Sequence, residues 1–380
     1  MKNERVEAPV LFDTIRTASR HQFGRATLNA PAVLNALSLA MIDLLAPQLA
    51  AWAEDPQVVG VVLDGAGDRA FCAGGDVVRV CRAIQAAGPG EVAPAASDFF
   101  EREYRLDYRI HTYPKPILCW GHGIVMGGGI GLMAGASHRV ATPRTRLAMP
   151  EIGIGLFPDV GGSWLLPRLP GRSGLFLALT GAPLNAADAR FAGLADFVLP
   201  HESLAGVLDS LSAERWQGDQ DADGARLSQV LAGFATHDLP PSNLLAQLDR
   251  IDAVIGGDDA LEEIAPRLSA LADDADPWLA QAGATFANGS PTSAALSFEL
   301  QRRARHLSLA DVFRLEYQAA VGCSVHHDFA EGVRALLIDK DKNPRWQPAT
   351  LGEVTRDLIA AHLAPRFDGP HPLSDLGSSP

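Results

Sequence analysis

Two glycine-rich loops, each placed after a continuous apolar run, constrain the fold of this chain more than any other feature. The runs Val58–Leu63 and Ile117–Trp120 are apolar without alternation, which is typical of strands buried on both faces of a sheet. The loops that follow them are Ala70–Asp76 and Met126–Gly131, with the sequences AFCAGGD and MGGGIG. Glycine weakens regular structure, so two such loops indicate that the backbone closely approaches another group.

The first part of the chain has the order of elements of an α/β fold. Ser38 can cap a helix whose apolar residues recur at helical spacing. Residues 138–142 form a third β-rich run after the two named above. Strand, glycine loop, helix and strand in succession predict an α/β core, which we place at residues 1–205.

The remainder of the chain is expected to be mostly helical. No β-rich run of comparable strength appears beyond Val198, and apolar residues recur on one helical face in the segments 244–255 and 261–271. The acidic segment 218–224 is typical of a turn. We therefore predict a mostly helical region over residues 206–380.

Charge and composition exclude several classes of partner. The formal net charge is −13, so neither nucleic acid nor an anionic membrane is expected as a general partner. A local pair such as Arg79 and Arg82 can still attract an anionic ligand. No stretch reaches the roughly 18 apolar residues of a membrane span. The first seven residues, MKNERVE, have no apolar run, so we expect neither a signal nor a transit peptide and predict a cytoplasmic location.

Signatures of metal and nucleotide chemistry are missing from the sequence. Adjacent His326 and His327 would point in different directions in regular structure, and we predict no metal site. The glycines near residue 130 match a dinucleotide-binding turn only weakly, because the third glycine comes one place late. The serine-hydrolase motif G-x-S-x-G and the zinc motif H-E-x-x-H do not occur. Four cysteines without CxxC spacing are expected to be reduced, buried thiols: Cys72, Cys81, Cys119 and Cys323.

A third segment, Met149–Gly162, places two carboxylates in apolar surroundings. Its sequence is MPEIGIGLFPDVGG. Glu151 has apolar neighbours that can raise its pKa toward that of a general base working near neutral pH. Asp159 follows a proline, so it is either a turn or cap residue or a second functional acid. If Met126–Gly131 opens a helix, its free N–H groups suit an oxygen that becomes negative during a reaction; the alternative is that its glycines only form tight turns.

Taken together, these segments resemble the crotonase (enoyl-CoA hydratase/isomerase) superfamily. The segments LNAP at 28–31 and LNAL at 34–37 are similar to the family's N-terminal motif. The two glycine loops resemble its oxyanion-hole elements. The resemblance implies a ββα spiral core, backbone N–H groups of Gly75 and Gly128 on a thioester carbonyl, and a substrate-binding Gly74.

A narrower resemblance is to the 3-hydroxyisobutyryl-CoA hydrolase family. It is carried by Met149–Gly162, by residues 99–104 (FFEREY) and by residues 327–351, which ordinary hydratases lack. It implies that Glu151 and Asp159 are the catalytic acids and that Glu103 contacts the substrate. On sequence alone, Glu103 would be interpreted as a solvated charge.

The resemblance also implies the reaction. Hydratases carry a second glutamate and dienoyl-CoA isomerases a further aspartate at the position of Gly131. We therefore expect hydrolysis of a short branched 3-hydroxyacyl-CoA, 3-hydroxyisobutyryl-CoA in valine degradation, with the helical region covering the active site. A hydratase, an isomerase or a catalytically silent acyl-CoA-binding relative are the alternatives. Coenzyme A belongs to the substrate, no cofactor is implied, and a homo-oligomer is possible.

Overall fold

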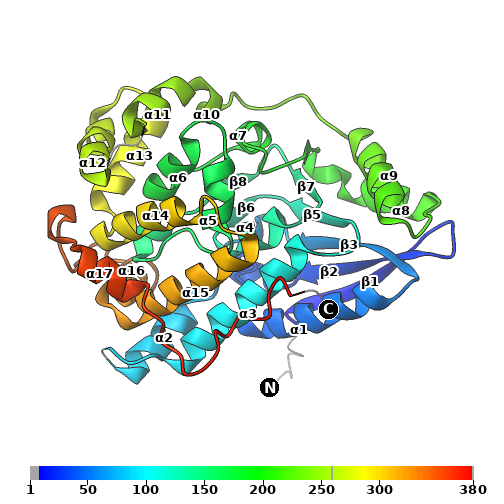
Figure 1. Ribbon diagram of the computed structural model, residues 1–380. Helices are drawn as coiled ribbons and strands as arrows, with labels where there is room; N and C mark the ends of the chain where they lie inside the picture. Colours follow the sequence, from blue (N-terminus) through cyan, green and yellow to red (C-terminus); the bar gives the residue numbers. More distant parts are fainter. Residues whose placement is uncertain (1–7, 89, 258–259, 379–380) are drawn as a thin grey trace, which may run out of the picture. The chain divides into compact units, whose positions relative to one another are not determined.

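The computed structural model describes residues 8–88, 90–257 and 260–378 (Figure 1). The N-terminal segment on which the cytoplasmic prediction depends therefore lies outside the described residues. By backbone contacts the chain forms two compact units, each assembled from three stretches. The first comprises residues 1–75, 109–147 and 185–242, and the second comprises residues 76–108, 148–184 and 243–380.

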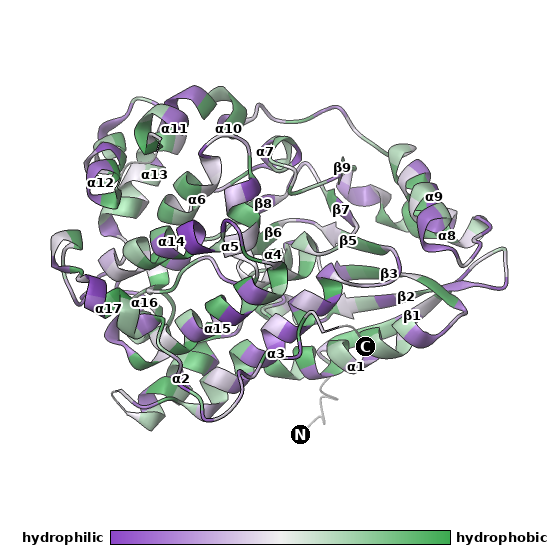
Figure 2. Ribbon diagram, viewed as in Figure 1, coloured by the Kyte–Doolittle hydropathy of each residue, from purple (hydrophilic) through white to green (hydrophobic). Residues whose placement is uncertain are grey.

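The first unit is built on a six-stranded sheet with the order β1-β2-β3-β5-β7-β9. Only the β1–β2 pair is antiparallel, and the neighbours from β2 to β9 run parallel. The predicted apolar runs form its central strands, which are fully buried and among the hydrophobic segments in Figure 2. The strands are β1 (Val10–Arg16), β2 (Gln22–Leu28), β3 (Val58–Gly65), β5 (Ile117–Gly121), β7 (His138–Ala141) and β9 (Phe197–Val198).

A second, three-stranded sheet contains the strands that alternate with these in sequence. Its order is β4 (Ala70–Cys72), β6 (Ile124–Met126) and β8 (Arg146–Ala148). Each pair β3–β4, β5–β6 and β7–β8 thus contributes one strand to each sheet. The helices α2 (Val77–Ala87) and α4 (Gly128–Ala134) follow the first two pairs. This repetition confirms the predicted ββα spiral.

Helices cover both faces of the large sheet (Figure 1). The helix α1 (Leu39–Glu54) packs against β1, β2 and β3, and the Ser38 side chain caps it as predicted. On the other face, Phe23, Val62 and Trp120 form a buried cluster with apolar residues of α8 (Leu204–Ala213) and α9 (Gln220–Ala232). These helices therefore belong to the first unit, which also contains α7 (Ala186–Phe191).

The second unit is built from helices. Its helices α3 (Pro94–His111), α15 (Leu309–Val325) and α16 (His327–Val333) pack through ring contacts among Phe100, Tyr104, Phe313 and Phe329. From Arg109 on, the end of α3 is grouped with the first unit. Besides α2, the helices are α3 (Pro94–His111), α5 (Gly162–Leu165), α6 (Ser173–Thr180), α10 (Asn243–Ala246), α11 (Leu248–Ile255), α12 (Leu261–Ala270), α13 (Pro277–Asn288), α14 (Pro291–Ala304), α15 (Leu309–Val325), α16 (His327–Val333) and α17 (Arg356–His362).

Two local predictions need correction or detail. The segment 244–255 is helical as predicted, but it is divided between α10, which ends at Ala246, and α11, which begins at Leu248. The acidic segment 218–224 is not a turn throughout, because α9 begins at Gln220. The Asp219 side chain accepts the N–H of Ala222, and acidic residues in a first helical turn interact favourably with the helix dipole.

The predictions about the whole chain concern the extent of the strands, the cysteines, the domain division and membrane spans. The last strand among the described residues ends at Val198. The prediction of reduced, buried thiols is confirmed, since all four cysteines are buried and none forms a disulfide within the described part of the chain. The compact units do not follow a single cut at residue 205. The helices α8 and α9 share a buried cluster with strands of the first unit, and residues 76–108 and 148–184 belong to the second unit. The proposed domain division stays a prediction. No helix within the described ranges is long and apolar enough to cross a membrane.

Candidate active-site groups

The two glycine loops lie side by side within the first unit. In the first loop, the N–H of Leu37 donates to the carbonyl of Gly74 at 2.8 Å, which fixes the peptide before Gly75. Gly74 has a φ of 109°, a conformation that favours glycine. A side chain at Gly74 would also be 3.4 Å from the carbonyl oxygen of Met126, at the start of the second loop. The backbone conformation therefore requires glycine at this position.

The second loop opens α4, whose first residue is Gly128. The first N–H groups of a helix have no carbonyl partner within it. Among the described residues, the N–H of Gly75 also donates to no backbone carbonyl. A Cβ atom at Gly129 would lie only 2.3 Å from the carbonyl oxygen of Cys72 on β4. Glycine at 129 thus lets α4 approach β4 closely and sets the spacing between the two loops.

Five buried carboxylates gather within the second unit. Glu103 and Asp107 lie one turn apart on α3, and Glu151 begins a 3-10 turn, Glu151–Ile154. Asp159 lies in the following loop, and Glu316 lies on α15. Each is at most 5% exposed. The structure therefore brings together all three acids that the sequence singled out: Glu103, Glu151 and Asp159.

Burial is the main influence on the pKa of each of these acids. It raises the pKa of Glu103 well above its usual range, and the neighbouring Asp159 and Glu151 raise it further. It raises the pKa of Glu151 in the same way, with Asp159 as the second cause. Burial also raises the pKa of Asp159, to about 6. Asp159 is thus the acid most readily ionised near neutral pH, and Glu151 is shifted in the direction that a general base requires.

Several carboxylate oxygens in this cluster lack a hydrogen-bond partner. Among the described residues this holds for Glu103 Oε1, Glu151 Oε2 and both oxygens of Asp107. A buried polar atom without a partner costs free energy, so it marks a position that a ligand or water can satisfy. None of the groups of acidic, histidine or cysteine side chains in the described part is arranged to hold a metal ion.

Two further residues shape the cluster, and sequence reasoning missed both. The Tyr104 hydroxyl donates to Asp159 Oδ2 at 2.7 Å. The Glu316 carboxylate accepts the N–H groups of Gly161 and Ser163, both at 2.8 Å, and so anchors the loop that follows Asp159. Burial raises the pKa of Glu316 to about 8, although these two hydrogen bonds oppose the shift.

A signal for Glu316 was present in the sequence. Its neighbours at helical spacing, Phe313 and Ala320, are apolar and buried. An acid on an apolar helical face is expected to have a specific partner. Glu103 carried no such signal, because Arg102 and Arg105 flank it; these arginines pair with Asp98 and Glu101. The sequence-only interpretation of Glu103 as a solvated charge was wrong.

Replacing Tyr104 with phenylalanine is expected to move the acidic limb of the pH profile of kcat/KM to higher pH. The Tyr104 hydroxyl lowers the pKa of Asp159 against the effect of burial, so its loss leaves the carboxyl protonated at a higher pH. We expect kcat/KM to fall several-fold near pH 6 and to stay within about two-fold near pH 8. An unshifted limb would show that ionisation of Asp159 does not limit the reaction.

Comparisons with known proteins agree on the family resemblance. Residues 23–363 match the family described as Enoyl-CoA hydratase/isomerase. The chain is 41% identical over 337 residues to the protein named "3-hydroxyisobutyryl-CoA hydrolase, mitochondrial" of Xenopus laevis, an alignment that covers 88% of this chain and 85% of the relative.

Two solved structures are also similar along nearly their whole length. A carnitinyl-CoA dehydratase from Mycobacterium thermoresistibile has a TM-score of 0.82 and 39% identity, covering 95% of this chain and 97% of that one. An enoyl-CoA hydratase from Rhodobacter sphaeroides 2.4.1 has a TM-score of 0.79 and 37% identity, covering 94% of this chain and 97% of that one. The names of the relatives thus divide between hydrolysis and the addition or removal of water.

Proposed function

Because the chain belongs to the enoyl-CoA hydratase/isomerase family, we propose that it hydrolyses the thioester of 3-hydroxyisobutyryl-CoA to 3-hydroxyisobutyrate and coenzyme A. The observation that carries this proposal is the group of buried acids Glu103, Glu151 and Asp159, which come from separate segments of a chain 41% identical to a hydrolase of that name. The family resemblance stated from the sequence is confirmed.

The proposed roles follow from the chemistry of each group. The N–H groups of Gly75 and Gly128 polarise the thioester carbonyl and stabilise the oxyanion of the tetrahedral intermediate, with Gly74 contributing to substrate binding. As a general base, Glu151 takes a proton from the water that attacks the carbonyl carbon; as a nucleophile, its carboxylate attacks that carbon and forms a mixed anhydride, which water then hydrolyses. Both routes need its ionised form. Asp159 orients the substrate hydroxyl or the water. The thiolate of coenzyme A leaves and takes up a proton.

A hydratase is the second candidate, because two structurally similar proteins carry hydratase or dehydratase names. Hydration of a double bond in this family uses a second glutamate where this chain has Gly131. We expect hydration of crotonyl-CoA to be negligible beside thioester hydrolysis. Both rates are measured on one preparation, by loss of the enoyl absorbance and by release of free thiol; comparable rates would favour the hydratase.

Selectivity for the 3-hydroxyl tests the substrate class. Glu103 Oε1 is buried without a partner among the described residues, so a substrate without the hydroxyl leaves a desolvated acceptor unsatisfied. That costs about 1–3 kcal/mol, or roughly ten- to a hundred-fold in kcat/KM. We therefore expect 3-hydroxyisobutyryl-CoA to be hydrolysed faster than isobutyryl-CoA by that factor.

The Glu103→Ala variant serves as the control for this explanation. Removing the acceptor should narrow the gap between the two thioesters, mainly by slowing the hydroxylated one. Equal rates in the unmodified protein would instead indicate a thioesterase of broad specificity. A gap that Glu103→Ala leaves unchanged would assign the hydroxyl contact to another residue, with Asp159 the next to test.

The cellular location and the oligomeric state of the protein stay predictions. A cytoplasmic location stays a prediction from the N-terminal composition, whereas the vertebrate relatives are named as mitochondrial. Acyl-CoA is the expected partner, and a homo-oligomer stays a prediction that sedimentation of the purified protein can test.

A further inference from the structure

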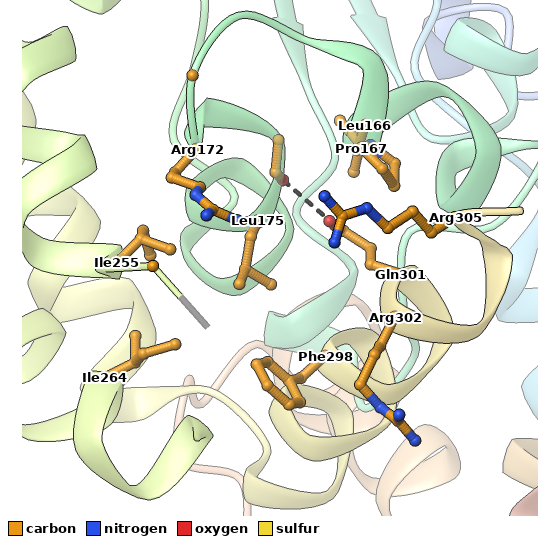
Figure 3. Close-up of a pocket in the computed structure, with 13 residues that line it drawn as sticks. Leu166, Pro167, Arg172, Leu175, Ile255, Ile264, Phe298, Gln301, Arg302 and Arg305 are labelled. Carbon is orange, nitrogen blue, oxygen red and sulfur yellow. Dashed lines mark hydrogen bonds between the residues drawn. The ribbon is translucent and has the colours of Figure 1, made fainter. Parts of the chain in front are cut away.

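A separate pocket in the second unit has a cationic rim and an apolar floor (Figure 3). Its volume is about 370 Å³, within the range of small-ligand sites. The floor is formed by Leu175 at α6, Ile264 at α12 and Phe298 at α14, and the rim includes Arg172 and Arg305. None of the buried acids of the candidate active site lines this pocket.

The two arginines of the rim have no acidic partner among the described residues. Several other arginines of the second unit form ion pairs; Arg302, which also lines the pocket, pairs with Glu299. No ion pair involves Arg172 or Arg305 within the ranges that the structure describes. Among the described residues, no carboxylate lines the pocket itself, and the neighbouring acid Asp252 accepts the backbone N–H of Arg172. In a chain with a net charge of −13, this is a marked local departure toward positive charge.

Figure 3 shows how the arginines are directed. The side chains of Arg172 and Arg305 extend from opposite walls toward the region beside Gln301, whereas Arg302 points away. Gln301 is 9% exposed, and its amide donates to the carbonyl of Gly174 at 3.3 Å. The two guanidinium groups can therefore approach one ligand from two sides.

The wall that carries Arg172 is held rigidly. A Cβ atom at Gly174 would lie 1.7 Å from the carbonyl oxygen of Leu166, so the chain packs here at backbone contact. The N–H of Arg172 also donates to Asp252 at 2.6 Å. These contacts fix the backbone from which the Arg172 side chain extends toward the pocket.

We propose that this pocket binds an amphipathic anion, with a carboxylate or phosphate head group between Arg172 and Arg305 and a short apolar tail on Leu175, Ile264 and Phe298. Guanidinium groups form charge-assisted hydrogen bonds with both kinds of head group. The apolar floor selects a ligand with a tail over a bare anion. The pocket is a site in addition to the one that would hold the thioester.

Calorimetric titration of the full chain with hexanoate, hexyl phosphate, 1-hexanol, acetate and inorganic phosphate tests the proposal. We expect hexanoate or hexyl phosphate to bind at least ten-fold more tightly than acetate, inorganic phosphate and 1-hexanol, since each of these lacks either the tail or the charge. The stronger of the two identifies the preferred head group. These titrations contain no thioester, so their outcome does not depend on the proposed hydrolysis.

Substitutions of single arginines test whether the anion binds in this pocket. Arg172→Gln and Arg305→Gln should each weaken binding of the preferred anion about ten-fold or more. Arg303→Gln is the matched control, because Arg303 lies on the same helix as Gln301, pairs with Glu299 and does not line the pocket; its binding should be unchanged. Melting curves of all three confirm that they are folded. No saturable binding of either amphipathic anion, or equal binding by all variants, would overturn the proposal.

Discussion

Replacing Glu151 with glutamine is expected to lower the turnover of 3-hydroxyisobutyryl-CoA by about 10² or more. Glutamine keeps the volume of the side chain and removes the group that takes a proton or attacks the carbonyl carbon. Glu151 is 4% exposed, burial raises its pKa well above the usual range, and one of its oxygens has no partner in the described part of the chain. Since burial already disfavours the charged form and glutamine keeps the volume, we expect the melting temperature not to fall.

The Glu101→Gln variant is the matched control for this substitution. Glu101 lies on α3, is partly exposed and pairs with Arg105, and such a pair contributes at most about 1 kcal/mol. Its turnover should stay within about two-fold of the unmodified protein. The measurement is the release of free thiol at saturating substrate, with a melting curve for each protein. Near-normal turnover of folded Glu151→Gln would remove Glu151 from the mechanism.

The sheet could be predicted from the sequence because burial on both faces leaves a simple pattern. Val58–Leu63 and Ile117–Trp120 are apolar at every position except one glycine, and both became central parallel strands. The glycine loops could be predicted because the positive φ at Gly74 and the close approach at Gly129 exclude other residues. Glycine at these positions is therefore visible in the sequence.

The surroundings of the acids could be predicted only in part. Glu151 and Asp159 stood out because apolar residues flank them in the chain. Glu103 was singled out by the family resemblance alone, and the apolar helical face around Glu316 did not indicate its partner. Their environment comes from segments far away in sequence: the Tyr104 hydroxyl binds Asp159, and Glu316 binds the backbone of Gly161. Local periodicity describes which face of a helix is apolar, and it does not describe which segment covers that face.

The grouping of α8 and α9 with the sheet shows the same limit. They lie in the region predicted to be mostly helical, but the sequence contained no sign of where they would pack. In the structure, Leu211 of α8 and Leu227 of α9 join the cluster around Phe23 and Trp120. Helical periodicity was enough to predict a helical region and not enough to predict the unit to which each helix belongs.

Replacing Gly129 with alanine is expected to reduce turnover by about 10²–10³, the effect of losing one oxyanion donor. Alanine favours a helix over glycine by up to about 1 kcal/mol, yet here its Cβ would lie 2.3 Å from the carbonyl oxygen of Cys72, so α4 must move away from β4. That movement displaces the N–H of Gly128, and the melting temperature should fall as well.

Gly224→Ala on α9 is the matched control, since its Cβ would meet nothing closer than 3.9 Å; it should keep full turnover and melt no lower than the unmodified protein. Because a general loss of folding would also reduce turnover, the deciding measurement is kcat of Gly129→Ala at a temperature where circular dichroism shows it folded. Normal turnover there would mean that the spacing of α4 and β4 does not position the oxyanion donors.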